Sequence, residues 1–122
     1  MAKGRDKHQD YLSELNLLGK ALARRSGRKC ELSEVSGTLV IHDLEGSKVA
    51  PSMDHVVLVS ESIKAALDGG AVDVDALRCL EHAVWSTVIP VRRAAVQLLE
   101  RIDAPWAHDA IENARTMNAT DA

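Results

Sequence analysis

The segment His55–Val59 reads His-Val-Val-Leu-Val and is the strongest β-strand signal in the chain. It is short and almost entirely apolar, which is typical of a strand that is covered on both faces of its sheet. A loop that contains Pro51 precedes it, and Ser60 after it is suited to cap a helix. These features predict a buried strand in a small sheet that helices cover.

The remaining pattern predicts an α+β fold, with helices before and after a small antiparallel sheet of about three strands. Residues 29–46 resemble a β-hairpin, with Cys30, Leu32 and Val35 in a first short strand, a turn at Ser36-Gly37 and a second strand from Thr38 to Leu44. An N-terminal helix is expected over 4–25. A C-terminal helical bundle is expected from helices over 61–67, about 76–86, about 90–102 and 105–117. We expect a single domain over residues 1–122.

The core has to be built with few aromatic side chains, because 122 residues include no Phe, one Tyr and two Trp. We expect Trp85 and Trp106 to anchor the core over the helices, which leaves few aromatic surfaces for stacking bases or sugars. No apolar stretch approaches the ~20 residues that span a bilayer, and Met1–Gln9 lacks the apolar region of a signal peptide. The chain is therefore expected to be cytoplasmic, with no membrane partner.

Charge is distributed unevenly along a chain whose net charge is −3. Residues 1–29 carry eight Lys and Arg against three Asp and Glu, whereas residues 30–122 carry seven against fifteen. A basic segment on an acidic body either packs electrostatically against that body or binds a phosphate-bearing partner. In the second case the expected contacts are Arg24, Arg25, Arg28 and Lys29.

Two segments of the chain resemble one protein family. The first is Arg25-Ser26-Gly27-Arg28-Lys29-Cys30-Glu31-Leu32, and the second runs from Leu77-Arg78-Cys79-Leu80 through Trp85-Ser86 and Val88-Ile89-Pro90-Val91 to Trp106. In order and spacing they are similar to PhnA-like proteins, which are named after an alkylphosphonate-utilisation operon. The resemblance covers roughly residues 20–110.

The resemblance implies a zinc ribbon, in which two Cys-x-x-Cys knuckles supply four thiolates to one tetrahedral Zn²⁺. Residues 29–63 would then form a degenerate ribbon between a basic helix (1–28) and the later helices (64–117). The four ligand positions fall at Cys30, Ser33, Ser60 and Ile63, so a single thiol remains. Neutral serine is a poor zinc ligand and isoleucine is none. We therefore interpret the site as vestigial and expect no metal and no cofactor.

Two histidines could rebuild a metal site with Cys30 and Asp54, because His42 and His55 also lie in or near the predicted sheet. The more ordinary interpretation makes both histidines half-exposed strand residues. Cys79 falls beside the apolar face of its helix and is expected to be a small buried side chain rather than a nucleophile. No Gly-x-Ser-x-Gly elbow or phosphate loop is present in the sequence. No catalytic residue is predicted, and the chain is not expected to be an enzyme.

Three functions follow, in decreasing order of support. The first is a non-catalytic interaction module that has lost its zinc site and binds a protein partner or a second copy of itself through the C-terminal helices. The second is nucleic-acid or phosphate binding through the basic N-terminal helix. The third is an enzyme of phosphonate metabolism, although the sequence shows neither the metal ligands nor the activated nucleophile that a phosphonate hydrolase needs.

Overall fold

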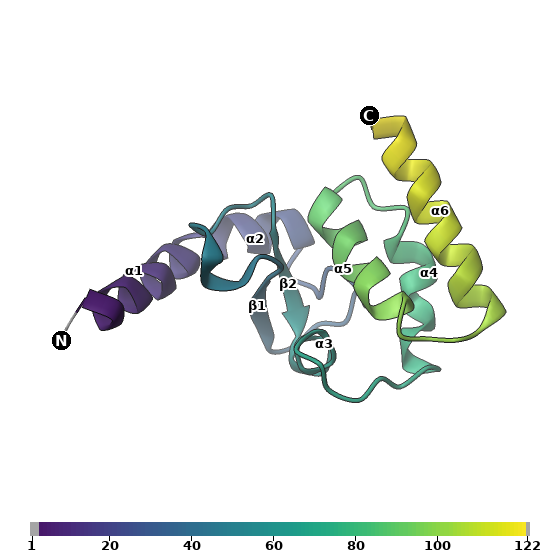
Figure 1. The fold of residues 1–122 in the computed structure, drawn as a ribbon, viewed down its shortest axis with the longest axis horizontal. Helices are drawn as coiled ribbons and strands as arrows, with labels where there is room; N and C mark the ends of the chain where they lie inside the picture. Colours follow the sequence, from purple (N-terminus) through teal and green to yellow (C-terminus); the bar gives the residue numbers. More distant parts are fainter. Residues whose placement is uncertain (1–2, 122) are drawn as a thin grey trace.

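The N-terminal part of the chain forms two helices in place of the single helix expected over residues 4–25. The computed structural model describes residues 3–121, with side chains for 9–46 and 48–119. Helix α1 (Lys3–Leu17) and helix α2 (Gly19–Ser26) are separated at Leu18. Gly19 weakens a continuous helix at this point, because glycine costs about 1 kcal/mol relative to alanine in a helix interior. Figure 1 shows α1 extending away from the rest of the molecule, whereas α2 lies against the sheet.

The sheet has two antiparallel strands within residues 3–121, β1 (Leu39–Asp43) and β2 (Val56–Ser60). The loop between them contains a short 3₁₀ helix, η1 (Gly46–Lys48). The strands predicted from Thr38 to Leu44 and from His55 to Val59 are confirmed to within one residue at each end. They pair with each other, with Ile41 opposite Leu58, so the predicted hairpin over 29–46 is wrong.

A tight loop around Cys30 replaces the predicted first strand. The Cys30 N–H donates to the Val35 carbonyl oxygen (3.0 Å), and the Glu34 N–H donates to the Cys30 carbonyl oxygen (2.8 Å). The edge of β2 is completed by one residue: the Glu31 N–H donates to the Leu58 carbonyl oxygen (2.8 Å), and the Glu31 carboxylate accepts from the Leu58 N–H (2.9 Å). Glu31 thus satisfies both backbone groups of Leu58, which a third strand would otherwise have paired.

Strand β2 is buried on both faces, as its apolar sequence predicted. Val57 and Val59 belong to the larger core, between the sheet and the C-terminal helices. Val56 and Leu58 belong to a smaller cluster with Leu22, which is fully buried on α2. The sheet is therefore a middle layer, with α2 on one side and the C-terminal helices on the other (Figure 1).

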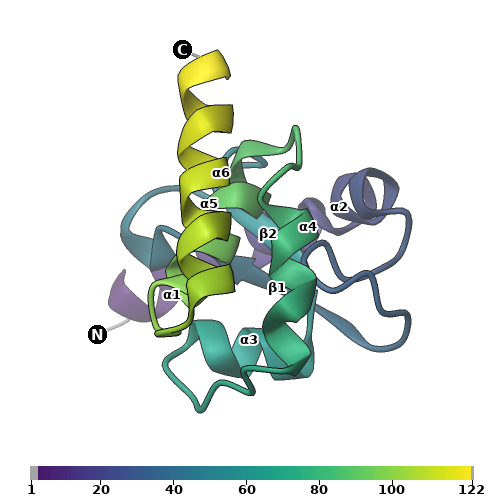
Figure 2. The same cartoon turned by 90° about the vertical axis from the view of Figure 1, so that its right-hand side faces the viewer.

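Helices build the second half of the chain. Helix α3 (Glu61–Leu67) follows β2 directly, and the 3₁₀ helix η2 (Ala76–Cys79) leads into α4 (Leu80–Ala83). Helices α5 (Ile89–Leu99) and α6 (Pro105–Asp121) complete the fold, with α6 lying across α4 and α5 (Figure 2). The α+β class is confirmed, although the helix expected over 76–86 is shorter and partly 3₁₀. Within the described range, none of the helices is long and apolar enough to cross a lipid bilayer.

One predicted core residue lies at the surface, and one unpredicted residue lies in the core. Trp85 is 48% exposed in the turn between α4 and α5, so the expectation that it anchors the core is wrong, whereas Trp106 is partly buried against the core. Arg92 of α5 is buried and donates to the Ser86 carbonyl oxygen (2.6 Å) and to Asn118 Oδ1 (3.1 Å). Arg92 thereby ties α5 to α6 and holds the turn that presents Trp85.

Candidate functional site

The four positions that the family resemblance assigns to zinc ligands lie near one another. Cys30 is buried, and its Sγ accepts a hydrogen bond from the Ser33 N–H (3.3 Å). Ser60 Oγ accepts from the Ile63 N–H (3.3 Å) at the start of α3. Ser33, Ser60 and Ile63 line one cavity of about 270 Å³. We call it the apolar cavity, because most of its other lining residues are Val35, Ala66, Ala71, Ala76 and Leu77.

The residues at these positions do not fit a structural zinc ion. A closed Cys₄ site needs four thiolates, and the chain offers one thiol, two hydroxyls and the hydrocarbon side chain of Ile63, which is 6% exposed in the core. In the part of the chain that the structure describes, no group of three or more His, Cys, Asp and Glu side chains is placed to hold a metal ion. The alternative site from Cys30, His42, Asp54 and His55 is therefore not assembled.

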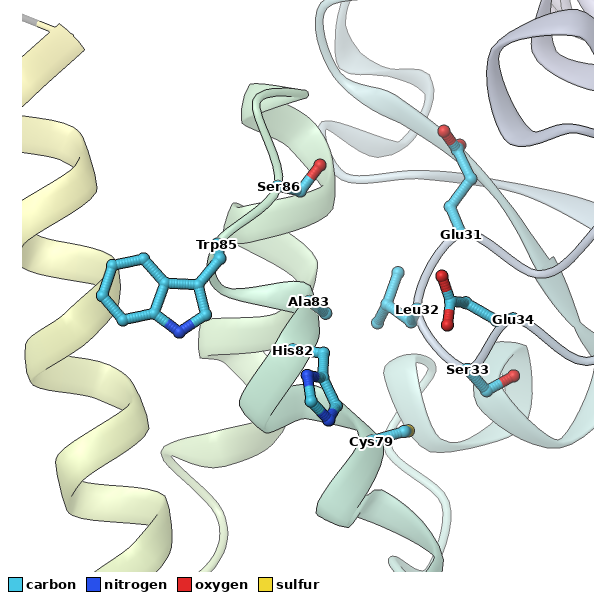
Figure 3. A pocket seen from close by; sticks show the side chains of 9 residues that line it. All are labelled: Glu31, Leu32, Ser33, Glu34, Cys79, His82, Ala83, Trp85 and Ser86. Atoms are coloured by element: carbon cyan, nitrogen blue, oxygen red, sulfur yellow. The ribbon is translucent and has the colours of Figure 1, made fainter.

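A second cavity, of about 290 Å³, contains the other cysteine. Its lining includes Cys79 from η2, His82 from α4 and Glu34 from the loop after α2, and we call it the polar cavity (Figure 3). The indole of Trp85 is directed away from these three side chains. Burial, the neighbouring Cys30 and the Glu34 carboxylate raise the pKa of the Cys79 thiol above its ordinary value. The thiol is protonated at neutral pH, which is the wrong state for a nucleophile.

His55 belongs to a hydrogen-bonded group that fastens α1 to the sheet. Its Nδ1 lies 2.9 Å from Asp43 Oδ1, and the Asp43 side chain is almost fully buried at the end of β1. The Tyr11 hydroxyl of α1 donates to Asp43 Oδ2 (2.8 Å). Burial, this hydrogen bond and the carboxylate charge together raise the pKa of Tyr11 to about 12. The group joins α1, β1 and the start of β2, so its hydrogen bonds stabilise the fold.

His42 is buried on β1, at 8% exposure, so the expectation that it is half-exposed is wrong. Its Nδ1 lies 3.3 Å from Lys64 Nζ and 3.5 Å from Asp68 Oδ1. Burial and the Lys64 charge lower the pKa of His42, and Asp68 and Asp43 only partly oppose this shift. A neutral imidazole that accepts from the Lys64 ammonium fits these directions. The cluster links β1 to α3.

Arg25, one of the four predicted phosphate contacts, is used inside the fold. Its guanidinium donates to both carboxylate oxygens of Glu31 (2.8 and 2.9 Å) and to the carbonyl oxygens of Met53 (2.8 Å) and Val56 (2.7 Å). The Glu31 side chain is 3% exposed. A buried carboxylate requires such a partner, so the structure places Arg25 in a folding role and removes it from the predicted binding surface.

The other three predicted contacts, Arg24, Arg28 and Lys29, are exposed at the end of α2 and in the turn after it. Lys20, which the sequence interpretation omitted, precedes Arg24 by four residues, so both lie on one face of α2. That spacing is the signal that could have found Lys20. These four cations, which we call the basic surface, form no ion pair with the described side chains of residues 9–46 and 48–119.

Comparison of the chain with protein-family models, with curated proteins and with solved structures gave no match. The groups around Asp43 and His42 are committed to the fold. The features that a ligand or partner can reach include the apolar cavity, the polar cavity, the basic surface and the exposed turn at Trp85.

Proposed function

We propose that the chain is a non-catalytic interaction module, built on a PhnA-like scaffold derived from a zinc ribbon and held together without zinc. The observation that carries this proposal is the placement of the four former ligand positions. They lie near one another, as ligands of one ion would, yet three of them serve packing and capping. Cys30 and Ile63 are buried in the core, and Ser60 caps α3. Such a site has structural use but no metal chemistry.

Apolar packing and helix capping take over the role of the metal in this proposal. The buried Ile63 side chain contributes on the order of 2 kcal/mol of transfer free energy. The Ser60 cap contributes about 1 kcal/mol more. Both act at the second knuckle. At the first knuckle, the bonds from Arg25 and from the Leu58 N–H to the Glu31 carboxylate hold the loop in place.

The turn between α4 and α5 supplies the proposed contact surface for a protein partner or a second copy. Trp85 is 48% exposed and Ile89 is 51% exposed on this turn. Tryptophan is enriched among the residues that dominate binding energy at protein interfaces. The hydrogen bond from Arg92 to the Ser86 carbonyl oxygen restrains the turn next to Trp85, which lowers the conformational entropy that binding through Trp85 would lose.

Native mass spectrometry of the unmodified chain, prepared with zinc available, tests the proposal. We expect a metal-free mass. If the partner is a second copy, the number of chains per assembly should fall when Trp85 is replaced by alanine. If the chain is monomeric, Trp85→Ala should instead lower the affinity for a protein partner that binds the unmodified chain. One zinc per chain would contradict the proposal.

Restoration of the three missing thiols tests the ribbon ancestry. In the variant Ser33→Cys/Ser60→Cys/Ile63→Cys we expect one Zn²⁺ per chain and a Tm that rises with zinc, because a ligand that binds only the native state stabilises it. The control variant Ser13→Cys/Ser36→Cys/Ile89→Cys carries three new cysteines at other places in the chain. It should not bind one equivalent of zinc. If the folded triple variant binds zinc no more tightly than this control, the four positions are not a former ligand set.

A second candidate function, binding of a phosphate-bearing polymer such as nucleic acid, is favoured by the basic surface. Lys20 and Arg24 project together from α2, and Arg28 and Lys29 continue the surface beyond its end. Arg25 between them is turned inward. The exposed cations are therefore not neutralised by the fold and can release counterions from a polyanion.

Salt dependence tests this second function. Four phosphate contacts predict that log Kd changes with log salt with a slope of about 3.6 on duplex DNA. The variant Arg24→Gln/Arg28→Gln should reduce the slope by about 1.8. The matched variant Arg93→Gln/Arg115→Gln removes the same charge from α5 and α6 and should leave the slope unchanged. No binding to mixed RNA or DNA at low salt would exclude this function.

A further inference from the structure

The space beside Ser33, Ser60 and Ile63 is not filled by side chains. The apolar cavity, of about 270 Å³, lies between the loop after α2, the start of α3 and η2. Small and aliphatic side chains make most of its wall: Val35, Ile63, Ala66, Ala71, Ala76 and Leu77. A cavity of ~150 Å³ lined by aliphatic side chains is already large enough to bind benzene. The cavity here has the volume for a substituted aromatic ring but is open to solvent on one side, because Val35, Ala71 and Ala76 are exposed.

One polar atom beside this cavity lacks a hydrogen-bond partner. Ser33 Oγ is buried and, among the described side chains (residues 9–46 and 48–119), it is the one buried polar atom without a partner. Ser33 lines both cavities, and Figure 3 shows its hydroxyl directed away from Cys79 and His82 of the polar cavity. In its present rotamer the oxygen is covered, so rotation about the Cα–Cβ bond to another staggered rotamer has to turn it into the apolar cavity before a ligand there can supply the missing hydrogen bond.

The other polar groups in the wall restrict the charge of a ligand. The Ser60 and Ser62 hydroxyls lie 3.2 Å apart and pair with each other, and Ser60 also caps α3. Asp73 is the charged residue of the lining, and its Oδ1 accepts from the Ala76 N–H (3.2 Å). No cation lines the cavity, so an anion would meet the Asp73 carboxylate without compensation.

We propose that the apolar cavity is a binding site for a small, uncharged, mainly apolar molecule with one hydrogen-bonding group, of the size of a substituted benzene. The apolar wall buries the ring, Ser33 pairs with the polar group, and Asp73 excludes anions. This site goes beyond the interaction module proposed above and does not depend on it, because the cavity and the unpaired hydroxyl exist whatever the ancestry of the fold.

Three matched probes test the site by NMR titration of the ¹⁵N-labelled full chain: toluene, p-cresol and p-toluate. We expect saturable shifts of the amides around the cavity with toluene and p-cresol. A net hydrogen bond of ordinary strength should make p-cresol bind about 2–10-fold more tightly than toluene. The carboxylate of p-toluate should make it the weakest ligand. Absence of saturable shifts with all three probes would overturn the proposal.

Variants assign the binding to this cavity. Ser33→Ala should remove the advantage of p-cresol while leaving the affinity for toluene within about twofold. Ala76→Phe or Ala71→Phe should occlude the cavity and abolish both affinities, whereas Ala21→Phe, on the exposed face of α2, should change neither. Binding that survives both occluding variants would overturn the site. An advantage of p-cresol that persists in Ser33→Ala would overturn the role of the hydroxyl.

Discussion

Replacement of Ile63 by serine probes the step by which packing substitutes for a metal. The change removes three carbon positions from a side chain that is 6% exposed in the core. At about 0.8 kcal/mol per buried methylene, the lost transfer free energy is about 2.4 kcal/mol. A newly buried hydroxyl adds about 1 kcal/mol, at the lower end of its range because the neighbouring cavity admits water. We expect the free energy of unfolding to fall by about 3 kcal/mol.

Urea unfolding followed by far-UV circular dichroism measures this change, and calorimetry checks it. For a chain of this length about 4 °C of Tm is lost per kcal/mol, so the variant should melt about 12 °C lower. Ile89→Ser is the matched control, because Ile89 is 51% exposed, and it should change stability by about 0.5 kcal/mol or less. Equal stabilities for the Ile63→Ser and Ile89→Ser variants would refute the argument that packing of the Ile63 side chain stabilises this part of the core.

Three further predictions concern the buried polar groups. Glu31→Gln should lower the free energy of unfolding by about 2 kcal/mol, measured by urea unfolding, because it weakens charged hydrogen bonds from Arg25. Tyr11, the single tyrosine, should titrate near pH 12 by ultraviolet absorbance. Its stabilising effect, present below pH 10, should disappear between pH 10 and 12, and Tyr11→Phe should remove that pH dependence. Because the pKa of His42 is lowered from 6.5 in the fold, His42 of the unfolded chain binds a proton at a higher pH than His42 of the folded chain. The free energy of unfolding should therefore fall as the pH drops below 6.5. The variant His42→Gln should weaken this pH dependence.

The parts of the fold that could be predicted from the sequence depend on local interactions. The segment Val56–Val59 is apolar at successive positions, and both of its faces are buried. Ser60 caps the helix that follows it. Gly27 ends α2 with φ of 65°, in the left-handed region that favours glycine. Each of these features is set by a few neighbouring residues, which is why the sequence pattern predicts them.

The features that could not be predicted depend on contacts between distant residues. Cys30, Leu32 and Val35 have the composition of a strand, but the Glu31 side chain occupies the edge of β2 across 27 residues. Arg92 has no local signal that distinguishes it from the exposed Arg93 next to it. Its burial depends on Asn118, 26 residues away. Charge counting likewise could not separate Arg25 from Arg24, because their different roles follow from which side of α2 faces the sheet.

The candidate site shows the same division. The resemblance to PhnA-like proteins implied four related positions, and Ser33, Ser60 and Ile63 do line one cavity beside Cys30. The existence of the cavity could not be predicted, because it depends on how η2 and its small side chains approach α3 across a loop without regular structure. The resemblance therefore pointed to this region of the chain, whereas the shape and lining of the cavity follow from the three-dimensional packing.

In the zinc-ribbon ancestry proposed above, the absence of thiols at Ser33, Ser60 and Ile63 is tolerable because each segment that a metal would have joined has another attachment. The first knuckle is fixed to β2 through Glu31 and Leu58, and to α2 through Arg25. The second knuckle is fixed by the Ser60 cap and by the packing of Ile63. These bonds form within or next to the knuckles, so neither knuckle requires the other for its own shape. The proposed ligand would then occupy a space that neither set of bonds crosses, so we expect its binding to leave both attachments in place.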